Sequence, residues 1–133
     1  MSQENVEVVR RIYEEGLIDR DPEQILELAT PDIEYVNPPE AIDSGTRRGH
    51  MEVAQALRSP SELFDSYRHD LHELYDCGET VVAAVSFRTR SRGSESEVIQ
   101  EEAHSWTLRD GRITRFEWNR DLAKALEAAG LSE

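Results

Sequence analysis

The chain is poor in cysteine and in basic residues. Cys77 is its single cysteine, so the chain can form no internal disulfide and no cysteine-rich metal site. Lysine and arginine number 15 against 28 aspartates and glutamates, which gives a formal net charge of −13. A surface of this sign repels phosphate groups, so we expect neither a nucleic-acid partner nor an anionic membrane as a partner.

The chain also lacks several patterns that would point to a membrane or a cofactor. Its first residues show no basic and then apolar signal segment, and no apolar run reaches the length of about 20 residues that crosses a bilayer. We therefore expect a cytoplasmic protein. There is no glycine-rich phosphate loop, no histidine and carboxylate set at metal-ligand spacing, and no Ser-His-Asp or Cys-His motif. We expect no metal and no cofactor.

Helical patterns dominate the first part of the chain. With 133 residues and 38% apolar content, the sequence predicts one domain, residues 1–133, with a real core. Apolar residues at near-helical spacing and helix-start and helix-stop residues predict three helices, over 2–17, from Asp21 to just before Pro31, and over 50–58. A closing helix is predicted over 122–129, with Asp121 as its cap and Gly130 as its stop.

Strand patterns dominate the second part. We predict an early strand over 33–37, a loop over 41–48, strands over 67–76 and 80–92, and a hairpin over 101–121. The facing of 67–76 stays open, because Leu71 and Leu74 have opposite parity. Helices followed by antiparallel strands predict an α+β domain whose helices cover one face of a curved sheet.

The hairpin allows two registers around Asp110-Gly111. A two-residue loop pairs Arg109 with Arg112 and puts Phe116 and Trp118 on the face opposite His104. A three-residue loop pairs Leu108 with Arg112 and gathers the apolar residues on one face. Since burial favours the register that segregates apolar side chains, we predict the second. The shared face then holds His104, Trp106, Leu108, Phe116 and Trp118.

The order of elements and four fragments resemble a known family. The fragments are Tyr35-Val-Asn-Pro-Pro39, Arg48-Gly-His50, Trp106-Thr-Leu-Arg-Asp-Gly111 and the ending Asp121…Ala125-Leu-Glu-Ala-Ala-Gly-Leu131. They resemble the polyketide-cyclase-like (SnoaL-like) proteins of the nuclear transport factor two-like superfamily, which includes ketosteroid isomerase and limonene-epoxide hydrolase. The resemblance implies a cone-shaped α+β barrel. Its curved, mostly antiparallel sheet would be covered on the concave face by three N-terminal helices, with a short C-terminal helix and a homodimer formed through the outer face.

Carrying the family's functional residues over leaves the chemistry open. Tyr13 is similar to the pocket tyrosine of ketosteroid isomerases, but Asn37 stands where their catalytic aspartate precedes a proline. An amide cannot accept a proton as a base at neutral pH, so that isomerase mechanism is not supported. His104 stands at the place of their second oxyanion donor. Arg88-Thr89-Arg90 lacks the aspartate of the Arg-x-Asp pair of limonene-epoxide hydrolases.

His104 is the main candidate for acid/base chemistry. Glu102 lies two residues earlier on the same side of the strand, and a carboxylate beside an imidazole fixes its tautomer and gives an acid/base pair. The alternative is a core histidine with one satisfied nitrogen. Tyr13 is either a hydrogen-bond donor in the cavity or a core tyrosine with its hydroxyl at the rim. His50 and His72 are read as structural or exposed, and His69 as either.

Aromatic residues predict an apolar wall of a ligand pocket. Trp106, Phe116 and Trp118 would form it with Val85 and Phe87, and the polar groups His104, Glu102 and Arg120 on the same face favour a pocket over a filled core. Arg120 is alternatively a rim residue. Asn37 either orients a ligand or forms the turn before Pro38. The predicted ligand-binding set is Asn37, Tyr35, Phe87, Trp106, Phe116, Trp118 and Arg120.

Two functions remain in balance. The first is a cofactor-independent isomerase, lyase or cyclase that binds a small apolar organic molecule, with His104, Glu102 and Tyr13 as catalytic residues. The second is a non-catalytic ligand-binding or dimeric accessory domain of the same shape. The sequence does not choose the ligand.

Overall fold

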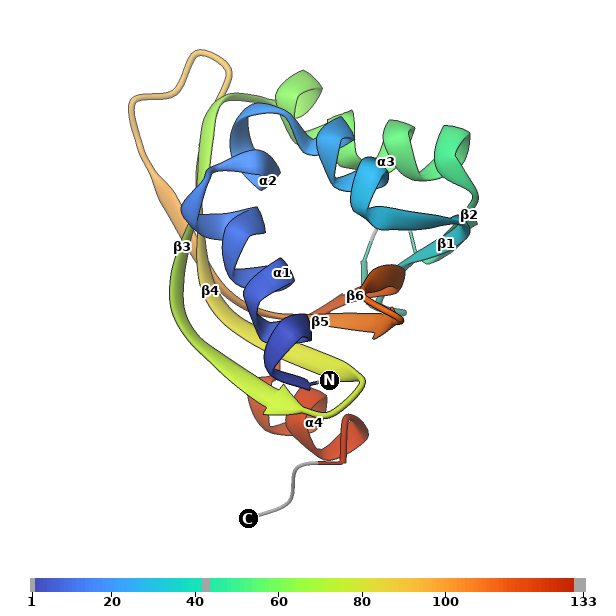
Figure 1. The fold of residues 1–133 in the computed structure, drawn as a ribbon. Helices are drawn as coiled ribbons and strands as arrows, with labels where there is room; N and C mark the ends of the chain where they lie inside the picture. Colours follow the sequence, from blue (N-terminus) through green and yellow to red (C-terminus); the bar gives the residue numbers. More distant parts are fainter. Residues whose placement is uncertain (1, 42–43, 131–133) are drawn as a thin grey trace.

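The computed structural model describes residues 2–41 and 44–130, and its helices precede most of its strands (Figure 1). The helices are α1 (Ser2–Glu14), α2 (Leu17–Arg20), the 3-10 helix η1 (Pro22–Leu28), α3 (His50–Leu63) and α4 (Leu122–Ala128). The strands are β1 (Ala29–Asn37), β2 (Gly45–Arg48), β3 (Phe64–Cys77), β4 (Thr80–Ser91), β5 (Val98–Arg109) and β6 (Arg112–Asn119). None of the helices among the described residues is long and apolar enough to cross a membrane.

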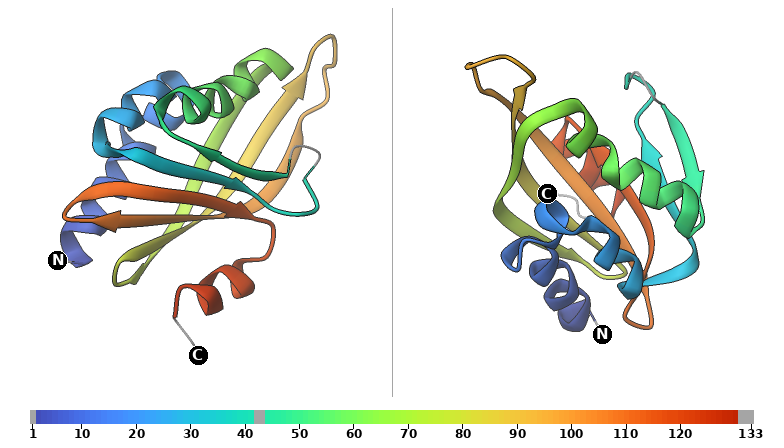
Figure 2. Two further views of the ribbon diagram at one scale, coloured as in Figure 1. Left: turned by 90° about the vertical axis from the view of Figure 1, so that its right-hand side faces the viewer. Right: turned by 90° about the horizontal axis from the view of Figure 1, so that it is seen from above.

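The strands form one curved sheet in the order β2-β1-β6-β5-β4-β3. All neighbours are antiparallel except β1 and β6, which run parallel. The helices α1, α2, η1 and α3 lie over the concave face, and α4 packs on the other side against the β4–β5 end (Figures 1 and 2). The predicted α+β cone is confirmed, with an open sheet in place of a closed barrel.

The main core lies between the helices and the concave face of the sheet. Val9 and Ile12 of α1 and Val81 and Ile113 of the sheet are each 0% exposed. Burying such a side chain fully stabilises the fold by about 1.5–3 kcal/mol. The amphipathic spacing predicted for 2–17 is therefore satisfied by tertiary packing, although α1 ends at Glu14 and Leu17 begins α2.

A β-bulge at His72 settles the facing of β3. The pairing with β4 advances from Leu71–Val85 directly to Glu73–Ala84, so His72 is an extra residue on β3. An inserted residue reverses the parity of everything after it. Leu71 and Leu74, which have opposite parity in the sequence, consequently both pack against the main core.

The turn of the hairpin differs from our prediction, yet the predicted aromatic face survives. Asp110 and Gly111 form a two-residue turn with φ of 53° and 79°, and Arg109 pairs with Arg112. The three-residue loop was therefore wrong. The pairing then passes from Leu108–Ile113 to Thr107–Arg115, so Thr114 is an extra residue. This second bulge restores the apolar-segregating parity, and Trp106 pairs with Phe116 and His104 with Trp118.

Three other boundaries depart from the sequence reading. Residues 22–28 form a 3-10 helix instead of an α-helix, because Ala29 is already extended in β1. The loop predicted over 41–48 contains β2, an edge strand whose polar residues give no alternating pattern; residues 42 and 43 lie outside the described part. Helix α3 continues to Leu63, since Pro60 in its last turn loses only its own N–H while its carbonyl still accepts from Phe64.

Candidate active site

The site forms where α1 crosses the inner face of β5. Residues 102, 104, 106 and 108 of β5 point inward, and all four are buried. Across β4, His104 faces Ala83, and this small neighbour leaves room for the imidazole ring. Tyr13 comes from the last turn of α1, and its ring lies 5.9 Å from the His104 ring and 6.2 Å from the Trp106 ring.

A continuous chain of hydrogen bonds joins the buried polar side chains. Trp106 Nε1 donates to the Tyr13 hydroxyl at 2.9 Å, and that hydroxyl lies 2.6 Å from His104 Nδ1. His104 Nε2 lies 2.8 Å from Glu102 Oε1, and Gln100 Nε2 donates to the other carboxylate oxygen. An ionised carboxylate only accepts, so His104 carries its proton on Nε2 and accepts the Tyr13 proton at Nδ1. The predicted set of His104, Glu102 and Tyr13 is brought together.

Burial sets the charge state of this chain. Loss of solvent lowers the pKa of His104 below its usual value, although the hydrogen bond and charge of Glu102 act in the opposite direction. Burial raises the pKa of Glu102, but the hydrogen bonds from His104 and Gln100 and the histidine charges outweigh it, and the net pKa is lowered. Burial also raises the pKa of Tyr13. The resting state at neutral pH is thus a neutral imidazole beside an ionised carboxylate.

His69 and Asp19 form a second imidazole–carboxylate pair in the same region. His69 Nδ1 lies 2.7 Å from Asp19 Oδ1, and the His69 backbone N–H donates to both carboxylate oxygens at 3.1 Å. The His69 ring stacks on the Phe87 ring, with 4.4 Å between the ring centres. It meets the His104 ring edge-on, with 5.4 Å between the ring centres. Sequence reasoning missed this pair, because the facing of β3 was open and Asp19 carried no motif.

Three side chains of these two pairs come close to one another. His69, Glu102 and His104 each have one nitrogen or carboxylate oxygen within 4.8 Å of the corresponding atoms of the other two. Sequence spacing did not foresee this cluster, because its members come from β3 and β5. Two histidines and a carboxylate also bind metals in some proteins. Here the Nε2–Oε1 contact of His104 and Glu102, at 2.8 Å, is a proton-holding hydrogen bond, and the arrangement suits acid/base chemistry.

The predicted aromatic wall is partly assembled around His104. The centre of the Phe116 ring lies 4.5 Å from that of Trp106 and 5.1 Å from that of His104. The Tyr35 ring packs against Phe116, with 5.0 Å between the ring centres. Phe87 instead lies against His69.

The remaining predicted ligand-binding residues lie farther out. Trp118 Nε1 donates to Asn37 Oδ1, so the Asn37 side chain orients an indole ring at the border of the wall. Arg120 is exposed, with its guanidinium carbon 5.9 Å from the Trp118 ring. Arg120 therefore lies at the rim of the site, which was the alternative to a place in the pocket wall.

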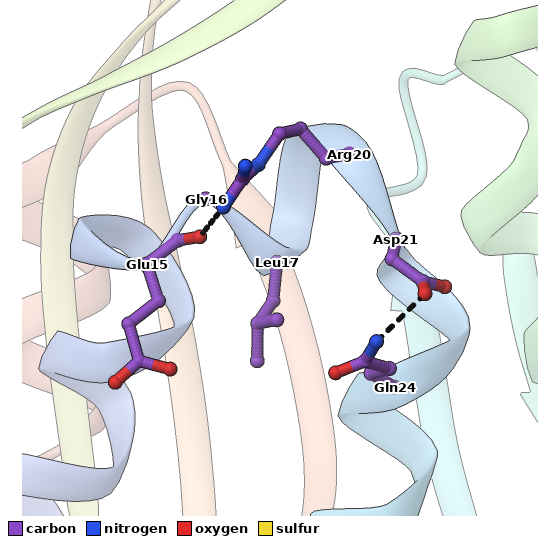
Figure 3. Close-up of a pocket in the computed structure, with 6 residues that line it drawn as sticks. All are labelled: Glu15, Gly16, Leu17, Arg20, Asp21 and Gln24. Atoms are coloured by element: carbon purple, nitrogen blue, oxygen red, sulfur yellow. Dashed lines mark hydrogen bonds between the residues drawn. The ribbon is translucent and has the colours of Figure 1, made fainter.

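Two shallow hollows lie on the helical side of the molecule. One, of about 350 Å³, is lined by residues of the α1–α2–η1 turn, including Leu17, Arg20 and Gln24 (Figure 3). The other, of about 480 Å³, lies between η1 and α3 and includes Met51. Neither is lined by Tyr13, His104 or Trp106. Tyr13, His104 and Trp106 are buried, while Tyr35, Phe87 and Trp118 are partly exposed at the margin of the site.

The outer sheet face carries an ion-pair network in place of a second site. Arg88 of β4 contacts Asp70 of the neighbouring strand β3 at 2.7 Å and Glu97, just before β5, at 3.0 Å. His72 Nε2 lies 2.6 Å from Ser86 Oγ, which donates to Glu101. The serine stands between the histidine and the acid, so this trio lacks the order of a nucleophilic triad.

Comparison with known proteins gives a family match and many structural matches. A family model described as the SnoaL-like domain matches residues 9–116. No curated protein matches the chain. TerC, crystallised with polyporic acid, is 29% identical, with a TM-score of 0.75 over 95% of this chain and 98% of TerC.

Two further solved structures have the same fold. An NTF2-like protein of unknown function from Burkholderia pseudomallei is 25% identical, with a TM-score of 0.76 over 96% of this chain and 98% of that one. A putative SnoaL-like polyketide cyclase from Jannaschia is 20% identical, with a TM-score of 0.77 over 98% of this chain and 94% of that one.

Proposed function

The chain belongs to the SnoaL-like domain family, and from that premise we propose that it is a cofactor-independent acid/base enzyme of the isomerase, lyase or cyclase type. Its substrate is a small, mostly apolar organic molecule that carries a carbonyl group. The observation that carries this proposal is the buried chain Trp106–Tyr13–His104–Glu102. A purely structural core has no need for an imidazole with a directed proton path.

The proton path explains how a histidine that is only 1% exposed acts on a ligand. The Tyr13 hydroxyl donates to His104 Nδ1, so its oxygen can accept a substrate proton while its own proton moves to the imidazole. Glu102 stabilises the imidazolium that forms, and Trp106 holds the phenol in place. His104 is thus the acid/base and Tyr13 the group that meets the substrate.

The aromatic residues provide the binding surface in this proposal. Tyr35, Phe116 and Trp118 present faces to a flat apolar ligand, and Asn37 fixes the indole of Trp118. The similarity to TerC, a protein crystallised with polyporic acid, supports a small organic ligand. A ligand that reaches the buried Tyr13 hydroxyl requires the partly exposed side chains at the margin to move. A non-catalytic ligand-binding domain is the second candidate, because Tyr13 and His104 are both buried.

The enzyme proposal is tested by binding and by exchange of carbon-bound protons. We expect small ketones that carry a phenyl group, such as 4-phenyl-2-butanone, to raise the melting temperature, because binding to the native state stabilises it. We also expect NMR in D2O to show accelerated exchange of the protons next to the carbonyl. His104→Gln keeps a side-chain donor for Glu102 but removes the basic ring nitrogen that takes the Tyr13 proton, so exchange falls at least about 100-fold while binding persists.

His50→Gln is the matched control for this experiment. His50 is exposed at the start of α3 and contacts only the Thr30 carbonyl at 3.1 Å among its recorded hydrogen bonds. This variant should behave like the wild type in both measurements. Exchange that survives in His104→Gln leaves the ligand-binding domain as the better function.

We also propose that the chain forms a homodimer through the outer face of its sheet, as the family resemblance implies. Ile99 of β5 is 49% exposed and pairs with Arg88, whose side chain belongs to the outer ion-pair network. Sedimentation equilibrium should give twice the chain mass of 15.2 kDa, and Ile99→Lys should shift the equilibrium toward monomer. A wild-type mass of one chain would refute the dimer.

A further inference from the structure

The cluster of His69, Glu102 and His104 has the composition of a site for a divalent metal ion. The three side chains are only 9%, 7% and 1% exposed. Each has one nitrogen or carboxylate oxygen within 4.8 Å of those of the other two. Two imidazoles and one carboxylate are a common ligand set for zinc and for other divalent first-row metals. His69, the member from β3, has no task in the proton path of Tyr13 and His104.

Asp19 orients His69 in the way that an outer partner orients a metal ligand. His69 Nδ1 lies 2.7 Å from Asp19 Oδ1, and the His69 backbone N–H donates to the same carboxylate. A neutral imidazole that donates from Nδ1 keeps its lone pair on Nε2. Nε2 makes no hydrogen bond to the residues that the structure describes. A positioned nitrogen with its lone pair available is what an incoming cation requires.

The other two members of the cluster also have outer partners. His104 Nδ1 lies 2.6 Å from the Tyr13 hydroxyl, so Nε2 is the nitrogen that faces Glu102. Gln100 Nε2 donates to Glu102 Oε2, which leaves Oε1 toward His104. Metal-binding histidines and carboxylates are usually held by such second hydrogen bonds, which fix their orientation. All three potential ligands are therefore oriented by the chain itself.

The charge and the spacing of the cluster suit one small divalent ion. Glu102 and Asp19 place two carboxylates at a largely buried position, where they favour a double positive charge. Zinc holds nitrogen and oxygen ligands at about 2.0–2.2 Å, so ligand atoms roughly 3–4 Å apart share one ion. The 2.8 Å contact between His104 Nε2 and Glu102 Oε1 would open by only about 0.5 Å to admit it.

We propose that His69, Glu102 and His104 bind one divalent ion of the zinc type, and that the bound ion blocks the proton path. The block, unlike the binding site, rests on the proposed function. An ion on His104 Nε2 displaces the proton that this nitrogen otherwise donates to Glu102. The neutral ring then takes one proton from water at Nδ1, so its total number of protons is unchanged. Nδ1 now donates to the Tyr13 oxygen and cannot accept the proton that the path delivers.

Binding is tested on untagged protein by calorimetry with zinc chloride and by the visible absorbance of bound cobalt(II). We expect one ion per chain. His69→Asn removes a ligand and should weaken binding by more than about 100-fold, whereas Asp19→Asn changes only the partner of a ligand and should weaken it by about 10–100-fold. His72→Asn is the matched control, since His72 is exposed and lies 3.8 Å from Glu101 on the outer face. This variant should bind like the wild type.

The block is tested by proton exchange of 4-phenyl-2-butanone in D2O, with zinc or with EDTA. At a free zinc concentration of about 100 times the wild-type Kd, about 1% of the chains lack the ion. We therefore expect zinc to slow exchange by the wild type about 100-fold relative to its own rate in EDTA. The same zinc concentration should slow folded His69→Asn by less than about threefold, relative to that variant in EDTA.

Glu102→Gln keeps the binding test decisive if His69→Asn does not fold, because it weakens a ligand from the other strand. Equal zinc affinity of the wild type and either folded ligand variant overturns the site. A wild type that exchanges but binds no zinc overturns this inference alone. Zinc that binds at the site without slowing exchange overturns the block. A wild type that shows no exchange even in EDTA overturns the proposed function and the block with it, while the calorimetry still decides the site.

Discussion

Tyr13→Phe is expected to lower the free energy of unfolding by about 2–6 kcal/mol, because one lost hydroxyl leaves two buried groups without a partner. Trp106 Nε1 loses its acceptor, and His104 Nδ1 loses its donor. An unsatisfied buried polar group costs roughly 1–3 kcal/mol. Urea denaturation of the wild type and the variant measures this difference.

Tyr35→Phe is the matched control for that measurement. The Tyr35 ring also packs against Phe116, but its hydroxyl makes no recorded hydrogen bond to a described residue. We expect this variant to change the free energy of unfolding by less than about 1 kcal/mol, since loss of the hydroxyl breaks no recorded hydrogen bond to a described residue. If the two variants lose the same amount, the Tyr13 hydroxyl is not the junction of a hydrogen-bonded chain.

Acid is expected to destabilise the fold from about pH 6.5 downward, and His104 is the main cause. The pKa of His104 is lowered by burial from its usual value of 6.5, so the unfolded chain takes up a proton at a pH where the folded chain does not. Stability therefore falls as pH falls below 6.5, by at most about 1.4 kcal/mol per pH unit, until the folded pKa is reached. The groups that face this imidazole are Glu102, His69, Asp19 and Tyr13.

The difference between wild type and His104→Gln isolates this effect. Between pH 6.5 and 5 the wild type should lose stability relative to the variant, which has no titrating group at position 104. Below pH 4.5 a second loss is expected, because the folded pKa of Glu102 is lowered and its ionised form contributes stability that protonation removes. Parallel curves for the two proteins between pH 6.5 and 5 would mean that His104 titrates normally.

The sequence predicted the architecture because its apolar spacing was readable. The helices over 2–17 and 50–58 and the strand over 80–92 have regular periods, and the structure contains each of them with shifted ends. The face that joins His104, Trp106 and Phe116 was also predicted, although by the wrong turn. A two-residue turn followed by a bulge at Thr114 puts the later residues of β6 on the same face as a three-residue loop would. The burial pattern predicted that face, but it could not distinguish the two ways of reaching it.

The half of the site around His69 was not predictable in the same way. A bulge at His72 reverses the parity of β3, and nothing in the residue types marks that position. Asp19 lies in the four-residue helix α2, whereas the sequence reading ended its first helix at residue 17 and began the next at Asp21. Whether the aromatic residues line an open pocket or pack around a buried centre was likewise not predictable, because both arrangements have the same sequence pattern.

The most direct test of the relay is proton exchange by wild type and Tyr13→Phe, with His50→Gln alongside. NMR in D2O would follow the protons next to the carbonyl of 4-phenyl-2-butanone at neutral pH. The proposed path from substrate through Tyr13 to His104 predicts accelerated exchange by the wild type and by His50→Gln, and a rate at least about 100-fold lower in folded Tyr13→Phe. Equal rates in Tyr13→Phe and the wild type would contradict it.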